Sequence, residues 1–131
     1  MDLARITPQQ AAHGIWQEKY ADADCVLLAG SVLRGEGTAY SDLDIVVLYE
    51  KVPHAWRESF THQGWPVEAF CHEPQTLNYF FELDIKSGFP SLPSMVAESI
   101  VIPQTTAIAE RAQKLAREIL LSGPPAWDAK S

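Results

Sequence analysis

The chain has 131 residues, of which 47% are hydrophobic and 21% charged, as is usual for one soluble globular domain. Its formal net charge of −7 argues against nonspecific affinity for nucleic acid, which needs clustered lysine and arginine. The sequence contains no apolar run of about 20 residues, so no membrane span is expected, and it shows no secretory signal. Cys25 and Cys71 form no disulfide framework, which predicts reduced thiols in a cytoplasmic protein.

The first half of the chain carries signals for one helix and two buried strands. Thr7-Pro8-Gln9-Gln10 predicts a helix start, with a threonine cap and a proline in the first turn, and the helix should reach about Tyr20. Residues 24–29 form a short apolar run, and residues 43–49 are rich in β-branched side chains. The glycines and serines of residues 31–41 predict a short helical turn and a loop between these strands.

The second half predicts a hairpin followed by helices. Residues 55–61 and 65–71 flank Gln63-Gly64, which is typical of a β-turn between two strands. Residues 75–85 are expected to form a helix, and residues 105–121 place Ile108, Leu115 and Ile119 at helical spacing, so we expect those three side chains to be buried.

The order of these elements predicts the fold class. Helix, strand, turn, strand, hairpin, helix and helix together favour an α/β (α+β) fold, a mixed β-sheet with helices packed mainly on one face. We expect one domain over residues 1–125 and a loose tail at residues 126–131.

Two aspartates stand at the start of the second strand. Residues two apart in a strand point the same way, so Asp42 and Asp44 should present both carboxylates on one face. Like charges this close repel each other, and a divalent cation relieves the repulsion. Mg²⁺ is typically held by one or two carboxylates together with substrate phosphates. The simpler alternative is that Asp42 only begins the strand as a turn residue.

Gly30-Ser31 follows the first strand and has the composition of a phosphate-binding turn. A glycine lets the backbone approach a ligand, and a following helix start points free N–H groups at an anion. Ser31 could equally be an ordinary helix cap, a role compatible with phosphate binding. Neither this pair nor the two aspartates alone is a specific sign of nucleotide binding, but their combination at this spacing is.

Gly30-Ser31, ten further residues and Asp42-Leu43-Asp44 resemble the signature of the DNA polymerase β-like nucleotidyltransferase superfamily. The chain looks most similar to the minimal nucleotidyltransferases and to the catalytic domain of antibiotic adenylyltransferases. The resemblance implies a mixed sheet, Mg²⁺ as cofactor, and transfer of a nucleotide, AMP from ATP, to a hydroxyl of a small molecule, protein or nucleic acid. It also implies that Gly30, Ser31, Arg34 and Ser41 contact the nucleotide and that Asp42 and Asp44 bind the metal.

The same resemblance implies a third carboxylate on a later strand, for which Glu68 is the candidate. Glu68 stands between Val67 and Ala69 in an otherwise apolar segment, an unusual place for an acid unless something compensates its burial. Many relatives have aspartate here, so Glu68 could bind metal or act as a general base. It could also be an exposed residue on the polar face of an edge strand.

Other interpretations of the chain stay open. It could be a nucleotide-binding, antitoxin-like module that acts with a helical partner protein or as a homodimer, or it could be an inactive homologue. Its four histidines match no compact metal motif and are expected at the surface: His13, His54, His62 and His72.

Overall fold

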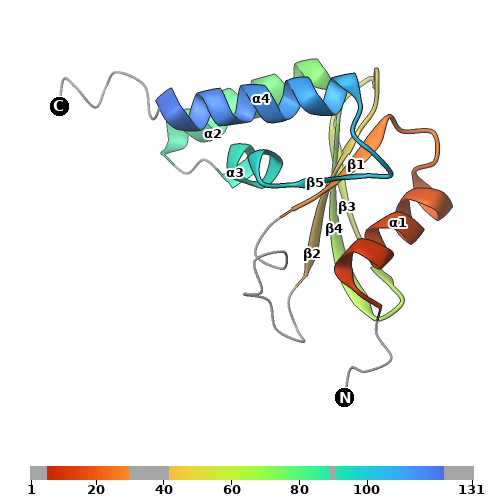
Figure 1. Cartoon of the computed structure of the whole chain (residues 1–131). Coiled ribbons are helices and arrows are strands. Elements are labelled where there is room, and N and C mark those ends of the chain that lie inside the picture. The colour runs from red at the N-terminus through yellow and green to blue at the C-terminus, as the bar shows by residue number, and fades with distance from the viewer. Residues whose placement is uncertain (1–5, 30–41, 89–90, 123–131) are drawn as a thin grey trace.

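The computed structural model describes residues 6–29, 42–88 and 91–122 (Figure 1). The predicted turn at residues 31–41 therefore lies outside the described residues. The elements run in the order α1 (Pro8–Lys19), β1 (Cys25–Leu28), β2 (Leu43–Leu48), β3 (Trp56–His62), β4 (Trp65–His72), α2 (Pro74–Ser87), α3 (Ser91–Ala97), β5 (Ile100–Ile102) and α4 (Ala107–Ser122).

Five strands form one mixed sheet in the order β3-β4-β2-β1-β5. The central pair, β2 and β4, is parallel, and every other neighbouring pair is antiparallel. The hairpin turns at Gln63 and Gly64, whose φ angles of 46° and 86° show why a glycine is suited to this turn. The expected mixed sheet is confirmed, but β5 was not predicted.

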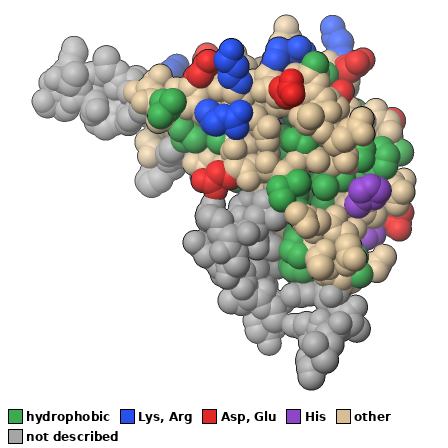
Figure 2. Space-filling model, in the orientation of Figure 1, with side chains coloured by type: hydrophobic (Ala, Val, Ile, Leu, Met, Phe, Trp, Pro, Cys, Tyr) green, Lys and Arg blue, Asp and Glu red, His purple; other side chains and the backbone are tan. Residues whose placement is uncertain are grey.

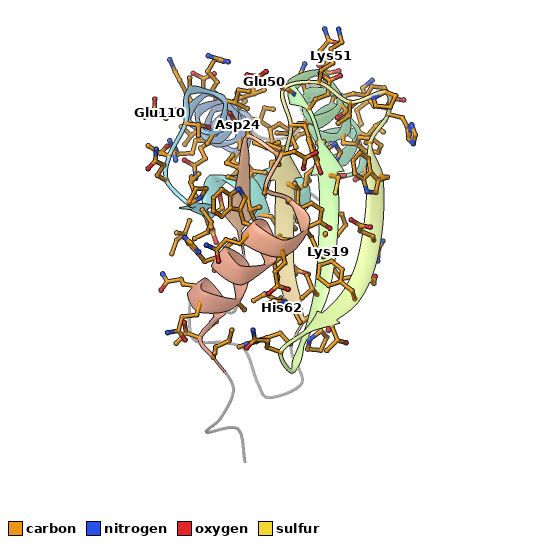
Figure 3. The ribbon with its side chains drawn as sticks, turned by 90° about the vertical axis from the view of Figure 1, so that its right-hand side faces the viewer. Lys19, Asp24, Glu50, Lys51, His62 and Glu110 are labelled. Carbon is orange, nitrogen blue, oxygen red and sulfur yellow. The ribbon has the colours of Figure 1, made fainter. Side chains whose placement is uncertain are left out.

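Helices cover both faces of the sheet unequally (Figure 1). One face carries α1 alone, whose buried residues Ala11, Ala12 and Ile15 share a core with Val26 and Ile45. Figure 3 looks onto this face, with α1 lying across the strands. The other face packs against α2, α3 and α4, so the expectation of helices mainly on one face is confirmed.

The helix ends follow the capping signals of the sequence. The side chain of Thr7 accepts a hydrogen bond from the backbone N–H of Gln10, and the Gln10 side chain accepts one from the Thr7 backbone, which completes a capping box. Pro74 opens α2, and Gly88 ends it with a φ of 85°. None of the helices that the structure describes is long and apolar enough to cross a membrane.

The burial of α4 differs from the prediction. Ile108, Leu115 and Ile119 are only half-buried, whereas the fully covered positions of the helix are its alanines: Ala109, Ala112 and Ala116. Small side chains let the helix pack closely against α3, so the longer ones lie along its sides. The opposite face of α4 is charged and exposed, and both signs of charge gather over it in Figure 2.

Candidate functional site

Three polar side chains form a row across the sheet. In the register of the strands, Ser59 on β3 is the partner of Glu68 on β4, and Glu68 is the partner of Asp44 on β2. Register partners share a face and lie about 4.8 Å apart in backbone. The row is on the face that carries α2, α3 and α4, near the beginning of β2, where Figure 1 shows the strand extending past these helices. The structure thus brings two of the three predicted acids side by side.

Asp44 is half-buried, and its ionised form is disfavoured. Burial raises the pKa of its carboxyl group, and the neighbouring charges of Asp42 and Glu68 raise it further, while Arg57 opposes them. Asp42 itself is exposed, directly before β2. The carboxylate of Asp42 therefore repels that of Asp44 in the folded chain, as expected. Two crowded oxygen donors of this kind suit a divalent cation such as Mg²⁺.

Glu68 is held by two partners that the sequence analysis missed. Ser59 Oγ donates to Glu68 Oε2 at 2.7 Å, and Arg57 places Nε at 2.9 Å and a terminal guanidinium nitrogen at 2.8 Å from Oε1. The hydrogen bond from Ser59 lowers the pKa of the Glu68 carboxyl, and Arg57 lowers it too. Glu68 is on an inner strand, so the alternative of an edge-strand residue is wrong. The hairpin register could have identified Ser59, since a turn at residues 63–64 pairs position 59 with position 68, whereas Arg57 is the partner of Phe70 and reaches Glu68 diagonally.

The nucleotide-binding residues predicted from the sequence lie outside the described part of the chain: Gly30, Ser31, Arg34 and Ser41. The residue directly before them, Ala29, donates its backbone N–H to the carbonyl of Asp44 at 3.0 Å. Over residues 6–29, 42–88 and 91–122, no three His, Cys, Asp or Glu side chains come together as a preformed metal site.

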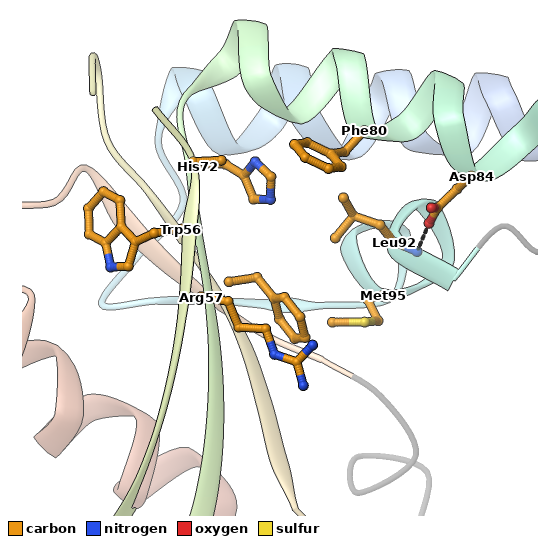
Figure 4. A pocket seen from close by; sticks show the side chains of 9 residues that line it. Trp56, Arg57, His72, Phe80, Asp84, Leu92 and Met95 are labelled. Carbon is orange, nitrogen blue, oxygen red and sulfur yellow. Dashed lines mark hydrogen bonds between the residues drawn. The ribbon is translucent and has the colours of Figure 1, made fainter. Parts of the chain in front are cut away.

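A cavity of about 390 Å³ opens on the same sheet face, further along β4 (Figure 4). It is enclosed by the hairpin, α2 and α3, and Asp84 Oδ2 ties the two helices together by accepting from the backbone N–H of Leu92 at 2.8 Å. The indole of Trp56 points away from the cavity. The lining residues are Ala55, Trp56, Arg57, Phe70, His72, Phe80, Asp84, Leu92 and Met95.

Two of the four histidines are buried, which corrects the expectation that all lie at the surface. His62 is 8% exposed and packs against α1, so close to Gly14 that a Cβ there would be 2.9 Å from His62 Nε2. His72 is 5% exposed, and its Nδ1 lies 3.0 Å from Thr76 Oγ1. Burial lowers the pKa of His72 to about 4, so its imidazole is neutral at pH 7.

The two cysteines lie apart in the fold. Cys25 and Cys71 are both free and buried, on opposite sides of the sheet. Burial raises the pKa of each thiol to about 12, so neither is a thiolate at neutral pH.

Comparison with known proteins adds to this geometry. A family model described as a nucleotidyltransferase domain matches residues 12–119. The fold is similar to that of a nucleotidyltransferase-like protein from Exiguobacterium sibiricum 255-15, with 15% sequence identity and a TM-score of 0.59 over 83% of this chain. This chain spans 38% of that protein's length. No protein of curated function matches the sequence.

Proposed function

The chain belongs to the nucleotidyltransferase domain family, and from this premise we propose that it transfers AMP from Mg²⁺-bound ATP to a hydroxyl group of an acceptor. The observation that carries the proposal is the pairing of Asp44 with Glu68 on adjacent parallel strands, beyond the cover of the helices. Gly30-Ser31, which we assign to the triphosphate, follows directly on the residue that is hydrogen-bonded to Asp44.

The carboxylates fit a metal in their chemistry. Asp42 and Asp44 would hold Mg²⁺, which would neutralise charge on the reacting phosphate and lower the pKa of the attacking hydroxyl. Glu68 keeps a lone pair on Oε2 beyond those that Ser59 and the two nitrogens of Arg57 engage, so it can serve as a third ligand. Its lowered pKa makes it a weak proton acceptor, which favours this role over that of general base.

The proposed transfer is a single displacement at the α-phosphorus of ATP. The acceptor oxygen forms a new bond to phosphorus, the bond from phosphorus to the oxygen that bridges to the β-phosphate breaks, and pyrophosphate leaves. The hydroxyl proton passes to solvent. The residues of the chain would act by position and charge: Ser31 and Arg34 would hold the triphosphate, and the carboxylates would hold the metal that neutralises charge on the reacting phosphate.

A labelling experiment tests this function. Purified chain is incubated with Mg²⁺ and ATP labelled at the α-phosphate, together with a bacterial extract that supplies acceptors. We expect label to pass to an acceptor with the wild type and with Asp22→Asn, an exposed control, but not with Asp44→Asn. Equal labelling by Asp44→Asn would overturn the proposal.

A nucleotide-binding module that acts with a helical partner is the second candidate. Large apolar side chains are exposed on α2 and α4, with Tyr79 58%, Leu83 41% and Leu121 88% exposed, as a partner surface would require. Binding of Mg²⁺-ATP without transfer to any acceptor, even when Asp44 is intact, would favour this candidate over the enzyme.

A further inference from the structure

We propose that the cavity between the hairpin, α2 and α3 binds the acceptor, and that the acceptor is a small aromatic compound with a hydroxyl group. The inference rests on the proposed nucleotidyl transfer and names the substrate class of the same site. The volume of the cavity, about 390 Å³, lies within the range of small-molecule pockets and accommodates one ring system.

The position of the cavity is the first argument. In the strand order, β1 lies on one side of β2, and β4 and β3 lie on the other. The paired carboxylates stand on β2 and β4, so a ligand in the cavity approaches them from the β4 side of this order. In-line displacement requires the attacking oxygen to be opposite the leaving pyrophosphate. The proposal therefore has the pyrophosphate leave on the β1 side, opposite an acceptor in the cavity.

The distance along β4 is the second argument. Phe70, which lines the cavity, is two residues from Glu68 on the same face, about 7 Å away along a strand. Arg57 spans the interval, since its guanidinium lies 5.3 Å from the centre of the Phe70 ring while it binds Glu68. A ring seated against Phe70 would thus lie two residues along β4 from Glu68, with the Arg57 guanidinium between them.

The chemistry of the lining selects the ligand. The rings of Phe70 and Phe80, with Leu92 and Met95, present flat apolar surface suited to an aromatic group. The two charged groups already have partners, Arg57 with Glu68 and Asp84 with a backbone N–H, so a highly charged acceptor gains little here.

His72 is the neutral polar side chain of the lining. His72 is only 5% exposed. Its ring points into the cavity beside that of Phe80, and the two ring centres are 5.3 Å apart (Figure 4). Thr76 takes up Nδ1, which leaves Nε2 as the atom that can bond to a substituent on the ring. A neutral imidazole of this kind recognises a polar edge of an otherwise apolar molecule.

Binding of 2-naphthol, followed by saturation-transfer NMR, tests the proposal. We expect the wild type to bind it and not glucose, which has hydroxyls but no aromatic ring. Met95→Trp should fill the cavity and remove the signal, and His72→Phe should weaken binding about 2- to 10-fold through loss of one hydrogen bond. Leu121→Trp, at a position 88% exposed, should bind like the wild type.

Competition with nucleotide separates the possible outcomes. At saturating Mg²⁺-ATP, we expect 2-naphthol to stay bound, because acceptor and nucleotide occupy different places. Displacement by Mg²⁺-ATP would assign the cavity to the base and overturn the acceptor role, as would binding that both Met95→Trp and His72→Phe leave unchanged. A chain that binds Mg²⁺-ATP but not 2-naphthol overturns the acceptor role alone. One that binds 2-naphthol but no Mg²⁺-ATP overturns the proposed function and the acceptor role with it.

Discussion

Burial and repulsion by neighbouring carboxylates both raise the pKa of the Asp44 carboxyl group. Its pKa in the folded chain is raised, so the folded state binds a proton more tightly than the unfolded state does. Ionised Asp44 therefore destabilises the fold at neutral pH, and this loss disappears as the pH falls below about 3.9, where the unfolded group is also protonated.

Asp44→Asn should consequently raise the melting temperature at pH 7 in EDTA, and the gain should shrink as the pH approaches 4. Differential scanning calorimetry of the wild type, Asp44→Asn and the exposed control Asp22→Asn measures this. A melting temperature that falls by several degrees in Asp44→Asn alone would make Asp44 a structural residue.

Glu68 differs from Asp44 because its charge is already compensated by Arg57 and Ser59. Glu68→Gln should leave most nucleotide binding intact, since two aspartates remain, yet reduce transfer about a hundredfold or more through the lost ligand. Label transfer and calorimetry on the same preparation separate the two effects. Glu118→Gln, an exposed substitution on α4, is the matched control, and normal turnover by Glu68→Gln would refute the three-acid site.

His72 makes the stability of the fold depend on pH. Its pKa is about 4 in the folded chain and about 6.5 when unfolded, so its contribution is complete above pH 6.5 and is lost as the pH falls toward 4. Between pH 7 and 4.5 the wild type should lose roughly 2–3 kcal/mol more than His72→Phe in urea denaturation. The exposed control His13→Gln should follow the wild type; equal pH dependence in all three proteins would show that His72 titrates normally.

At the scale of elements, α4 shows what helical periodicity can and cannot predict. The spacing identified the apolar side of the helix, but it did not give the depth of burial, which depends on how closely the helix approaches α3. Ala116 is fully buried, while Leu115 beside it is half-buried.

Enlarging a buried alanine tests this packing. Ala116→Leu should cost about 1–3 kcal/mol of unfolding free energy because the close contact cannot accept a larger side chain. Leu121→Ala, at a largely exposed position, should stay within about 0.5 kcal/mol. Urea denaturation that ranks the two substitutions the other way would contradict the arrangement of α4.

The strands were predictable where they are long enough to show a pattern. The hairpin and the two central strands have turn signals and apolar runs of their own, and their bounds agree with the prediction to within one residue or so. β5 has three residues and owes its existence to pairing with β1, a contact between distant segments that local sequence does not record. Arg57 was not predicted as a site residue because its role comes from its contact with Glu68 on the neighbouring strand.

At the scale of the whole molecule, the sheet has helices on both faces, while the beginning of β2 extends past α2, α3 and α4. Asp44, Glu68 and the cavity lie on the face that these three helices cover, so the fold places the proposed metal ligands and the proposed acceptor pocket along neighbouring positions of β4. The similar solved structure is much longer, with this chain covering 38% of it, so additional chain completes the molecule there.

The central claim is that the carboxylates bind ATP through a divalent cation. Isothermal titration calorimetry of the chain with ATP, in Mg²⁺ and then in excess EDTA, tests it most directly. Because Asp42, Asp44 and Glu68 repel a bare polyphosphate, we predict binding in Mg²⁺ that is lost in EDTA and lost in Asp44→Asn. Equal affinity for ATP in Mg²⁺ and in EDTA would contradict it.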